Sequence, residues 1–181
     1  MLHGKSDIFA VVSDITLLPK RNAYIGTLRL IVSDTTIGNA SDNPELLNAT
    51  IADIIRTFLR RHETTVDSIL WNVPAQPLLQ IVAGSIYGYG VYPSDIQLAE
   101  AAVAALSAGI ASLDDYLVVS LRDKGGMQRI CIGTFVKTQE IRTVRPLVDR
   151  VVESSSVRAA VLAFVGSLDA MCGFLVNIPE P

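Results

Sequence analysis

The sequence predicts an α+β fold, with a mostly antiparallel sheet and about three main helices in a single domain over residues 1–181. The chain is long enough for one core of ordinary size, and half of its residues are apolar while only 18% are charged. Segments that alternate in polarity surround tight turns, which is typical of hairpins. Segments with helical periodicity fall between them irregularly, so a regular parallel β/α arrangement is not predicted.

The first element is predicted to be a β-hairpin. Asp7–Asp14 is rich in β-branched and aromatic residues, and a turn follows at Pro19 and Asn22. Ala23–Asp34 then alternates between apolar and polar positions, as a half-buried antiparallel strand does. His3 precedes this hairpin, in a terminus that we expect to be mobile.

A helix is predicted from Pro44 to His62. The preceding residues are rich in Asp, Thr, Asn, Ser and Gly and indicate a loop that begins at Asp34. Asn43 can cap the helix, Pro44 suits its first position, and the charge of Glu45 suits its N-terminal end. An apolar stripe with helical spacing follows: Leu47, Ile51, Ile54, Ile55 and Phe58.

The middle of the chain gives weaker signals. The short apolar run 66–73 predicts a strand, and residues 74–95 are compatible with a short helix followed by a loop. A second helix is predicted from Asp95 to Ala108, because Ser94 and Gln97 have the spacing of a capping box and Gly109 suits the C-terminal end.

The second half begins with another hairpin. Its strands lie at 116–121 and 127–135, around a turn that contains Gly125 and Gly126, and paired glycines permit the positive φ angles of tight turns. Residues 137–152 are compatible with one more strand, which Pro146 would confine to an edge of the sheet or end. A last helix is predicted over 156–171, capped by Ser154 or Ser155.

Composition and charge narrow the function classes. No apolar run is long enough to span a bilayer and no secretory signal is visible, so we expect a cytoplasmic protein without a membrane partner, despite a mean hydropathy of +0.40. The net charge of −3 argues against a nucleic-acid partner, which would require a basic surface. Cys131 and Cys172 lack the spacing of a zinc site or disulfide framework, which indicates buried free thiols.

The chain shows no catalytic motif. It has no Ser nucleophile elbow, no phosphate-binding loop and no zinc-hydrolase pair, and the glycines Gly88 and Gly90 form only part of a dinucleotide fingerprint. His62 closes the first predicted helix, where capping explains it better than catalysis. Asp34 and Asp42 share a loop without the acidic spacing of a calcium site. We therefore predict no enzyme activity, no cofactor and no metal.

Two groups of residues are candidates for recognition. Tyr87, Tyr89 and Tyr92 form an aromatic loop, and tyrosine is favoured at interfaces, although packing on their own domain is the better-supported alternative. Asp114 and Asp115 are adjacent, so on a strand they would face opposite sides and could not act as a catalytic pair. A polar turn before a strand explains them more simply.

The order of these segments resembles the immunity proteins of bacterial polymorphic-toxin and contact-dependent growth inhibition systems. The likeness rests on "DIFAVVSDI", "YIGTLRLIVSDTTIGNASDNPELLNATIADII", the hairpin "LDDYLVVSLRDKGGMQRICIGT" and the helix "ESSSVRAAVLAFVGSLD". Gln128-Arg129 stands where those families place an acidic residue followed by Arg, and residues 66–113 have no counterpart. About half of the chain takes part in the resemblance.

The resemblance implies a non-catalytic protein that binds and neutralises the C-terminal domain of a cognate toxin, often a nuclease. The toxin-binding candidates are Asp34, Asp42, Glu45, Tyr87, Tyr89, Tyr92, Asp114, Asp115 and Asp123. Two alternatives remain. A small-molecule-binding enzyme would show a concave site with a perturbed carboxylate or His62. A homo-oligomeric binding module would form its dimer through the alanine-rich segment Asp95–Ala108.

Overall fold

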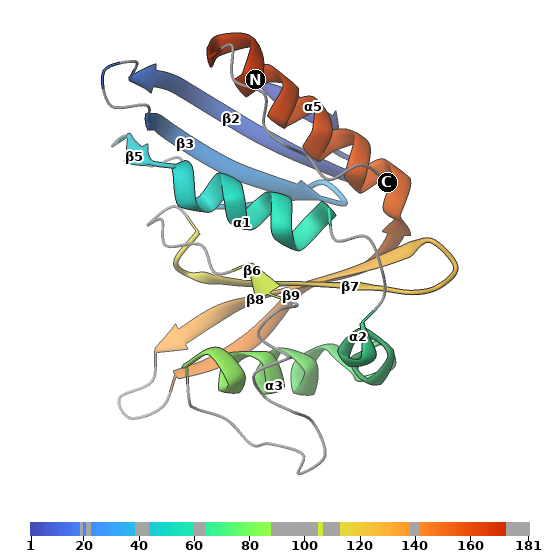
Figure 1. Ribbon diagram of the computed structural model, residues 1–181. Coiled ribbons are helices and arrows are strands. Elements are labelled where there is room, and N and C mark those ends of the chain that lie inside the picture. Colours follow the sequence, from blue (N-terminus) through green and yellow to red (C-terminus); the bar gives the residue numbers. More distant parts are fainter. Residues whose placement is uncertain are drawn as a thin grey trace. The chain divides into compact units, whose positions relative to one another are not determined.

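The computed structural model describes residues 1–18, 20, 23–38, 44–59, 64–87, 105–106, 113–137 and 142–172. Its contacts divide the chain into two compact units (Figure 1). Unit 1 comprises Met1–Arg61, Ala108–Leu113 and Ser155–Pro181, and unit 2 comprises His62–Ser107 and Asp114–Ser154. Each unit has an antiparallel sheet with helices, so the predicted α+β class is confirmed. The assignment of residues 1–181 to one domain stays a prediction.

Within the described residues, the sheet of unit 1 has five strands, of which the sequence predicted the two of the first hairpin. In order, β1 (Leu2–Lys5), β2 (Phe9–Leu18), β3 (Ala23–Val32) and β4 (Thr35–Ile37) lie side by side, and the fifth strand pairs with β3. The expectation that His3 lies in a mobile terminus is wrong. It pairs with Val11 within β1, and its side chain is only 8% exposed.

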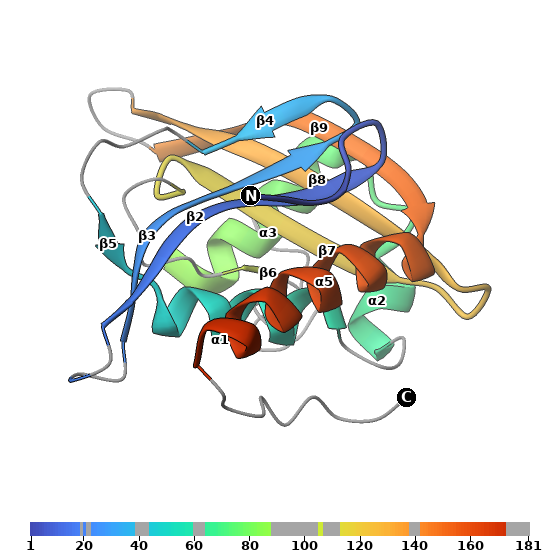
Figure 2. The ribbon, with the colours of Figure 1, turned by 90° about the horizontal axis from the view of Figure 1, so that it is seen from above.

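The helices of unit 1 cover one face of this sheet. They are α1 (Asn48–Leu59) and α5 (Ser154–Cys172). Both lie on the same side of β2 and β3 in Figure 2. Phe9 of β2 meets Phe58 of α1 with ring centroids 4.9 Å apart, and His3 meets Phe164 of α5 at 5.7 Å. The last helix is therefore confirmed, and its buried Val157, Val161 and Phe164 lie on one stripe. The prediction that Ser154 or Ser155 caps it is wrong, because the helix already begins at Ser154, directly after β9.

The first predicted helix begins later than expected. Residues Glu45–Leu46 form the short strand β5, which pairs with Ile25 and Gly26 of β3. The side-chain oxygen of Asn48 accepts a hydrogen bond from the backbone nitrogen of Tyr24 at 2.8 Å. These bonds to a distant strand hold the segment extended, and a local capping pattern does not predict such bonds.

The segment predicted as a loop from Asp34 also contains regular structure. Ser33 and Asp34 adopt positive φ angles of 47° and 62°, and Val32 pairs with Thr35. This is a two-residue hairpin turn, and β4 follows it directly. Asp tolerates the left-handed conformation better than most residues, which is why the chain can reverse here without glycine.

The sheet of unit 2 is built on the predicted second hairpin. Its strands are β6 (Ala105–Leu106), β7 (Tyr116–Arg122), β8 (Met127–Lys137) and β9 (Arg142–Glu153), in that order. The predicted edge position of Pro146 is confirmed, because β9 is the last strand and a bulge lies beside Pro146. In the turn, Gly126 has a φ of 82° and Asp123 accepts a hydrogen bond from the Met127 nitrogen.

Two predictions for the middle of the chain are wrong where the structure describes them. The predicted strand over 66–73 is instead α2 (Thr65–Leu70), which starts with a capping box between Thr64 and Asp67. The end of the predicted helix Asp95–Ala108 is strand β6, because Ala105–Leu106 pairs with β7. The remainder of that helix lies outside the described residues.

The helix α3 (Ala75–Tyr87) continues the second unit, and α2 and α3 pack on one face of its sheet. The buried cluster that joins them contains Leu70, Leu78, Leu79, Val82, Leu117, Val119, Leu121, Cys131 and Val144. Gly133 permits this packing, because a Cβ there would lie 2.8 Å from Leu79 and 2.4 Å from Val144. Among the described residues, no helix is both long and apolar enough to cross a membrane.

Candidate functional site

The predicted toxin-binding residues are distributed over both units. Asp34 lies exposed in the β3–β4 turn and Glu45 lies in β5, both in unit 1. The described candidates of unit 2 are Tyr87, Asp114, Asp115 and Asp123. Asp42, Tyr89 and Tyr92 lie outside the described residues. The candidates therefore have to be judged unit by unit.

The Asp123 side chain stabilises the hairpin turn of unit 2. Its Oδ1 accepts a hydrogen bond of 2.7 Å from the backbone nitrogen of Met127, and the Asp123 nitrogen donates to the Met127 carbonyl at 3.1 Å. It follows β7, whereas Asp114 and Asp115 precede this seven-residue strand. At about 3.3 Å per residue, the strand separates them by roughly 23 Å.

Tyr87 and Asp115 are brought together by Phe135. The Tyr87 ring meets the Phe135 ring edge-on, with centroids 5.4 Å apart and an interplanar angle of 87°. The backbone nitrogen of Phe135 donates a hydrogen bond of 3.0 Å to the carbonyl of Asp115. Tyr87 is 44% exposed, and Asp114 and Asp115 are exposed as well. We call the surface formed by Tyr87, Asp114 and Asp115 the tyrosine–aspartate end.

This surface has the chemistry of recognition. An aromatic ring held by a second ring offers a preformed apolar contact, and the exposed carboxylates of Asp114 and Asp115 offer charge and hydrogen-bond acceptors. The sequence suggested Tyr87 and the aspartates separately. Phe135 links Tyr87 to Asp115 because β8 returns beside β7, and the Phe135 ring reaches the end of α3.

A buried ion pair in unit 2 was missed by the sequence analysis. Arg129 of β8 is 7% exposed and makes two hydrogen bonds to Asp149 of β9, Nε to Oδ1 at 2.8 Å and Nη2 to Oδ2 at 2.7 Å. Its Nη1 also donates to the carbonyls of Trp71 and Val73. Arg129 thus joins two strands to the α2–α3 connection. The hydrogen bond with Asp149 raises the pKa of Arg129.

The neighbours of Arg129 are also buried. Burial, followed by the nearby charge of Asp149, raises the pKa of the Cys131 thiol to about 12, and the prediction of a buried free thiol is confirmed at this position. Gln128 donates a 2.6 Å hydrogen bond from Nε2 to Ser120 Oγ. The Gln128-Arg129 pair singled out by the resemblance therefore lies inside unit 2 and offers no contact surface.

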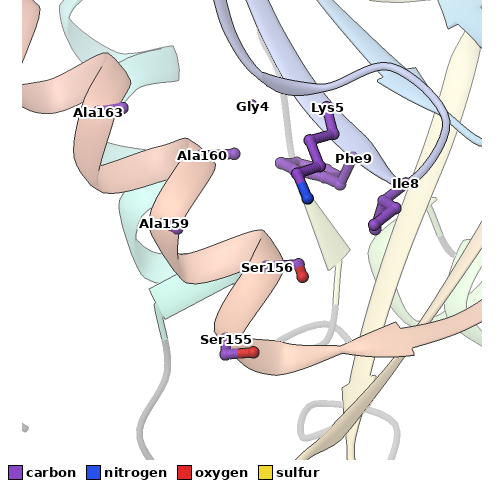
Figure 3. Close-up of a pocket in the computed structure, with 9 residues that line it drawn as sticks. All are labelled: Gly4, Lys5, Ile8, Phe9, Ser155, Ser156, Ala159, Ala160 and Ala163. Carbon is purple, nitrogen blue, oxygen red and sulfur yellow. The ribbon is translucent and has the colours of Figure 1, made fainter.

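Unit 1 contains a pocket between residues 4–9 and the first turns of α5 (Figure 3). Its volume is about 440 Å³. Ile8, Phe9 and Ala160 line its apolar part, and Lys5, Ser155 and Ser156 line its polar part. No predicted site residue takes part in it. A pocket of this size and composition lies within the range of small-molecule sites.

The described residues contain no group of His, Cys, Asp and Glu side chains that could hold a metal ion. Comparison with known proteins finds no matching family model, curated protein or solved structure for this chain.

Proposed function

We propose that this protein is an immunity protein, a non-catalytic inhibitor that binds the C-terminal domain of a cognate toxin in the bacterial cytoplasm. The proposal rests on the resemblance of the segments around both hairpins and on one observation, the tyrosine–aspartate end of unit 2. A nuclease is the toxin class that suits this surface best, since a nuclease needs a basic surface for phosphates.

The geometry of Tyr87 favours binding. Large aromatic side chains supply much of the energy of protein interfaces. The edge-on contact with Phe135 restrains the Tyr87 ring before any partner arrives. A side chain that is already ordered loses less conformational entropy on binding, so more of its contact energy appears as affinity.

The aspartates favour a basic partner. Asp114 and Asp115 are exposed, and the whole chain carries a net charge of −3. The carbonyl of Asp115 accepts a hydrogen bond from the backbone of Phe135, whose ring contacts Tyr87. Opposite charges steer association and raise its rate, especially at low salt. Binding at this end would place carboxylates where a nuclease otherwise holds phosphate groups.

The experiment that tests the proposal has two stages. The tagged protein is first used to capture its partner from the native host, and the captured polypeptide is identified by mass spectrometry. The purified pair is then compared by calorimetry for the wild type, Tyr87→Ala, the double variant Asp114→Lys/Asp115→Lys, and Asp7→Lys. Asp7→Lys is the matched control, because it reverses an exposed aspartate of unit 1.

We expect the C-terminal part of a large secreted protein to be recovered and its activity to be blocked by the purified protein. Loss of an interface tyrosine that contributes about 2 kcal/mol weakens binding roughly 30-fold, and the aspartate reversal slows association. Asp7→Lys leaves the Kd unchanged. Unaltered affinity in both tyrosine–aspartate variants would reject this surface, and a captured protein whose activity persists in the complex would reject the immunity role.

A further inference from the structure

The pocket of unit 1 has an apolar wall made of small side chains. Ala159, Ala160 and Ala163 of α5 face Ile8 across it, and Figure 3 shows these side chains on the two sides of the space. Ala159 and Ala163 are exposed, whereas Ala160 is buried. The methyl groups are too short to fill the gap between helix and hairpin, which leaves an apolar surface open to a ligand.

The walls of the pocket are held at a fixed separation. Gly4 has a φ of 109°, and a Cβ there would lie 2.6 Å from the Cβ of Ala160 and 2.4 Å from the carbonyl oxygen of Phe9. The strand and the helix therefore approach closely at Gly4. The ring contact between His3 and Phe164 lies beside this approach and adds a second point of attachment.

One end of the pocket is cationic. Lys5 directs its amino group toward Ser156 in Figure 3, and the described residues provide neither a hydrogen bond nor an ion pair for this amino group. Ser156, toward which this amino group points, also lines the pocket and carries a hydroxyl group. This end can therefore offer one positive charge and a hydroxyl donor to an anion.

We propose that this pocket binds an amphipathic carboxylate, an organic acid with a short hydrocarbon chain. The carboxylate pairs with Lys5 and accepts a hydrogen bond from the Ser156 hydroxyl, while the hydrocarbon chain lies against Ile8, Ala159 and Ala163. The lining along α5 from Ser155 to Ala163 corresponds to about 12 Å of helix, at 1.5 Å per residue. This length suits a medium-length acyl chain in extended form.

The charge of the lining selects this class of ligand. Lys5 is the one cationic side chain among the residues that line the pocket, so a doubly charged phosphate ester would keep an uncompensated charge. A neutral alcohol would make the apolar contacts and leave the amino group without a partner. This function is independent of toxin binding, because the pocket and the tyrosine–aspartate end belong to different units.

The test uses the full chain labelled with ¹⁵N. Amide spectra are recorded while butanoate, hexanoate or octanoate is added, with octan-1-ol as the uncharged probe and acetate as the probe without a chain. The variants are Lys5→Gln, which removes the charge, and Ala159→Leu, which fills the pocket from an exposed helix position. Lys20→Gln removes an exposed lysine of unit 1 that does not line the pocket and serves as the control.

We expect octanoate to shift the amides of residues 4–9 and 155–163 in a saturable manner. Affinity should rise about two- to fourfold for each added methylene, since each buried CH₂ contributes up to roughly a fourfold gain. Lys5→Gln should weaken octanoate binding about two- to fivefold, the effect of one exposed ion pair, and Lys20→Gln should not. Ala159→Leu should weaken it more than tenfold.

Three results would overturn the proposal. The first is the absence of saturable shifts at the pocket below the concentration at which octanoate forms micelles. The second is equal affinity for octan-1-ol and octanoate together with an unaffected Lys5→Gln variant. The third is unchanged binding in Ala159→Leu, provided that its circular dichroism shows the native fold.

Discussion

The Arg129–Asp149 ion pair gives the sharpest prediction for stability. Replacing Arg129 by Met removes two hydrogen bonds to the carboxylate and the donors to the carbonyls of Trp71 and Val73. Breaking a buried ion pair costs about 3–5 kcal/mol. The Asp149 side chain is 34% exposed and can be rehydrated, so we expect the lower end of this range, about 3 kcal/mol.

A double-mutant cycle isolates the pair from the rest of the packing. Asp149→Val alone leaves the Arg129 charge buried, although the two carbonyls still accept from it, and we expect a loss of about 2 kcal/mol. The double variant Arg129→Met/Asp149→Val leaves no unpaired charge. Its loss should be about 2 kcal/mol smaller than the sum of the two single losses, within the usual range for residues in contact.

Urea denaturation followed by Trp71 fluorescence measures these free energies of unfolding. Trp71 is the single tryptophan of the chain, and its carbonyl accepts a hydrogen bond from Arg129, so the signal reports on unit 2. A loss below about 1 kcal/mol for Arg129→Met, or single losses that add to within about 0.5 kcal/mol, would refute the view that this pair holds the α2–α3 connection to the sheet.

Three further predictions follow from buried and capping groups. Burial lowers the pKa of His3 below its ordinary value of 6.5, so the unfolded chain binds the proton more readily. Stability is therefore complete above pH 6.5 and declines as the pH falls below it. The protection factors of the β1 amides, which compare intrinsic with observed exchange rates, should fall over that range, and His3→Gln should remove this pH dependence; protection factors that do not respond to the substitution would contradict it. Cys131, with a pKa of about 12, should resist a thiol reagent at pH 8 until urea unfolds unit 2, and rapid labelling of the native protein at this position would oppose its burial. Thr64→Ala should lower the free energy of unfolding by about 1 kcal/mol, because the α2 cap is lost, whereas Thr64→Ser should keep most of the stability that the cap provides. Equal urea midpoints for the two variants would speak against the cap.

The parts of the fold that the sequence predicted are those with strong local patterns. Its β-branched and aromatic residues identified β2, alternating polarity identified β3, β7 and β8, and helical periodicity identified α5 and most of α1. The missed strands are short and exist because each pairs with a longer strand. Leu2–Lys5, Glu45–Leu46 and Ala105–Leu106 have two to four residues each, too few to show a period, and each pairs with a longer strand.

The helix α2 was missed for a different reason. Its capping box uses Asp67 at the position where Glu or Gln is more usual, and the apolar run that follows is compatible with a strand. The buried position of Arg129 gave no signal in the sequence, because charged residues on an alternating strand are usually solvated. Only the pairing of β8 with β9 and the approach of the α2–α3 connection show that this guanidinium makes four hydrogen bonds to three residues.

The sequence predicted which residue types form the candidate surface, but it did not predict how those residues are arranged. Tyr87, Asp114 and Asp115 were selected because tyrosine and aspartate are common in recognition surfaces. The same argument also selected Asp123, whose carboxylate instead stabilises a turn. Distinguishing a recognition residue from a turn residue required the hydrogen bonds. The pocket left no signal in the sequence, because its wall consists of alanines that look like ordinary helix positions.

The most direct test of the immunity proposal is growth of a bacterial host that expresses the captured toxin domain together with this protein. The proposal predicts that the wild type and Asp7→Lys restore growth, whereas Tyr87→Ala combined with Asp115→Lys gives reduced protection at equal protein abundance. Arrested growth in the presence of the abundant, folded wild-type protein would contradict the proposal.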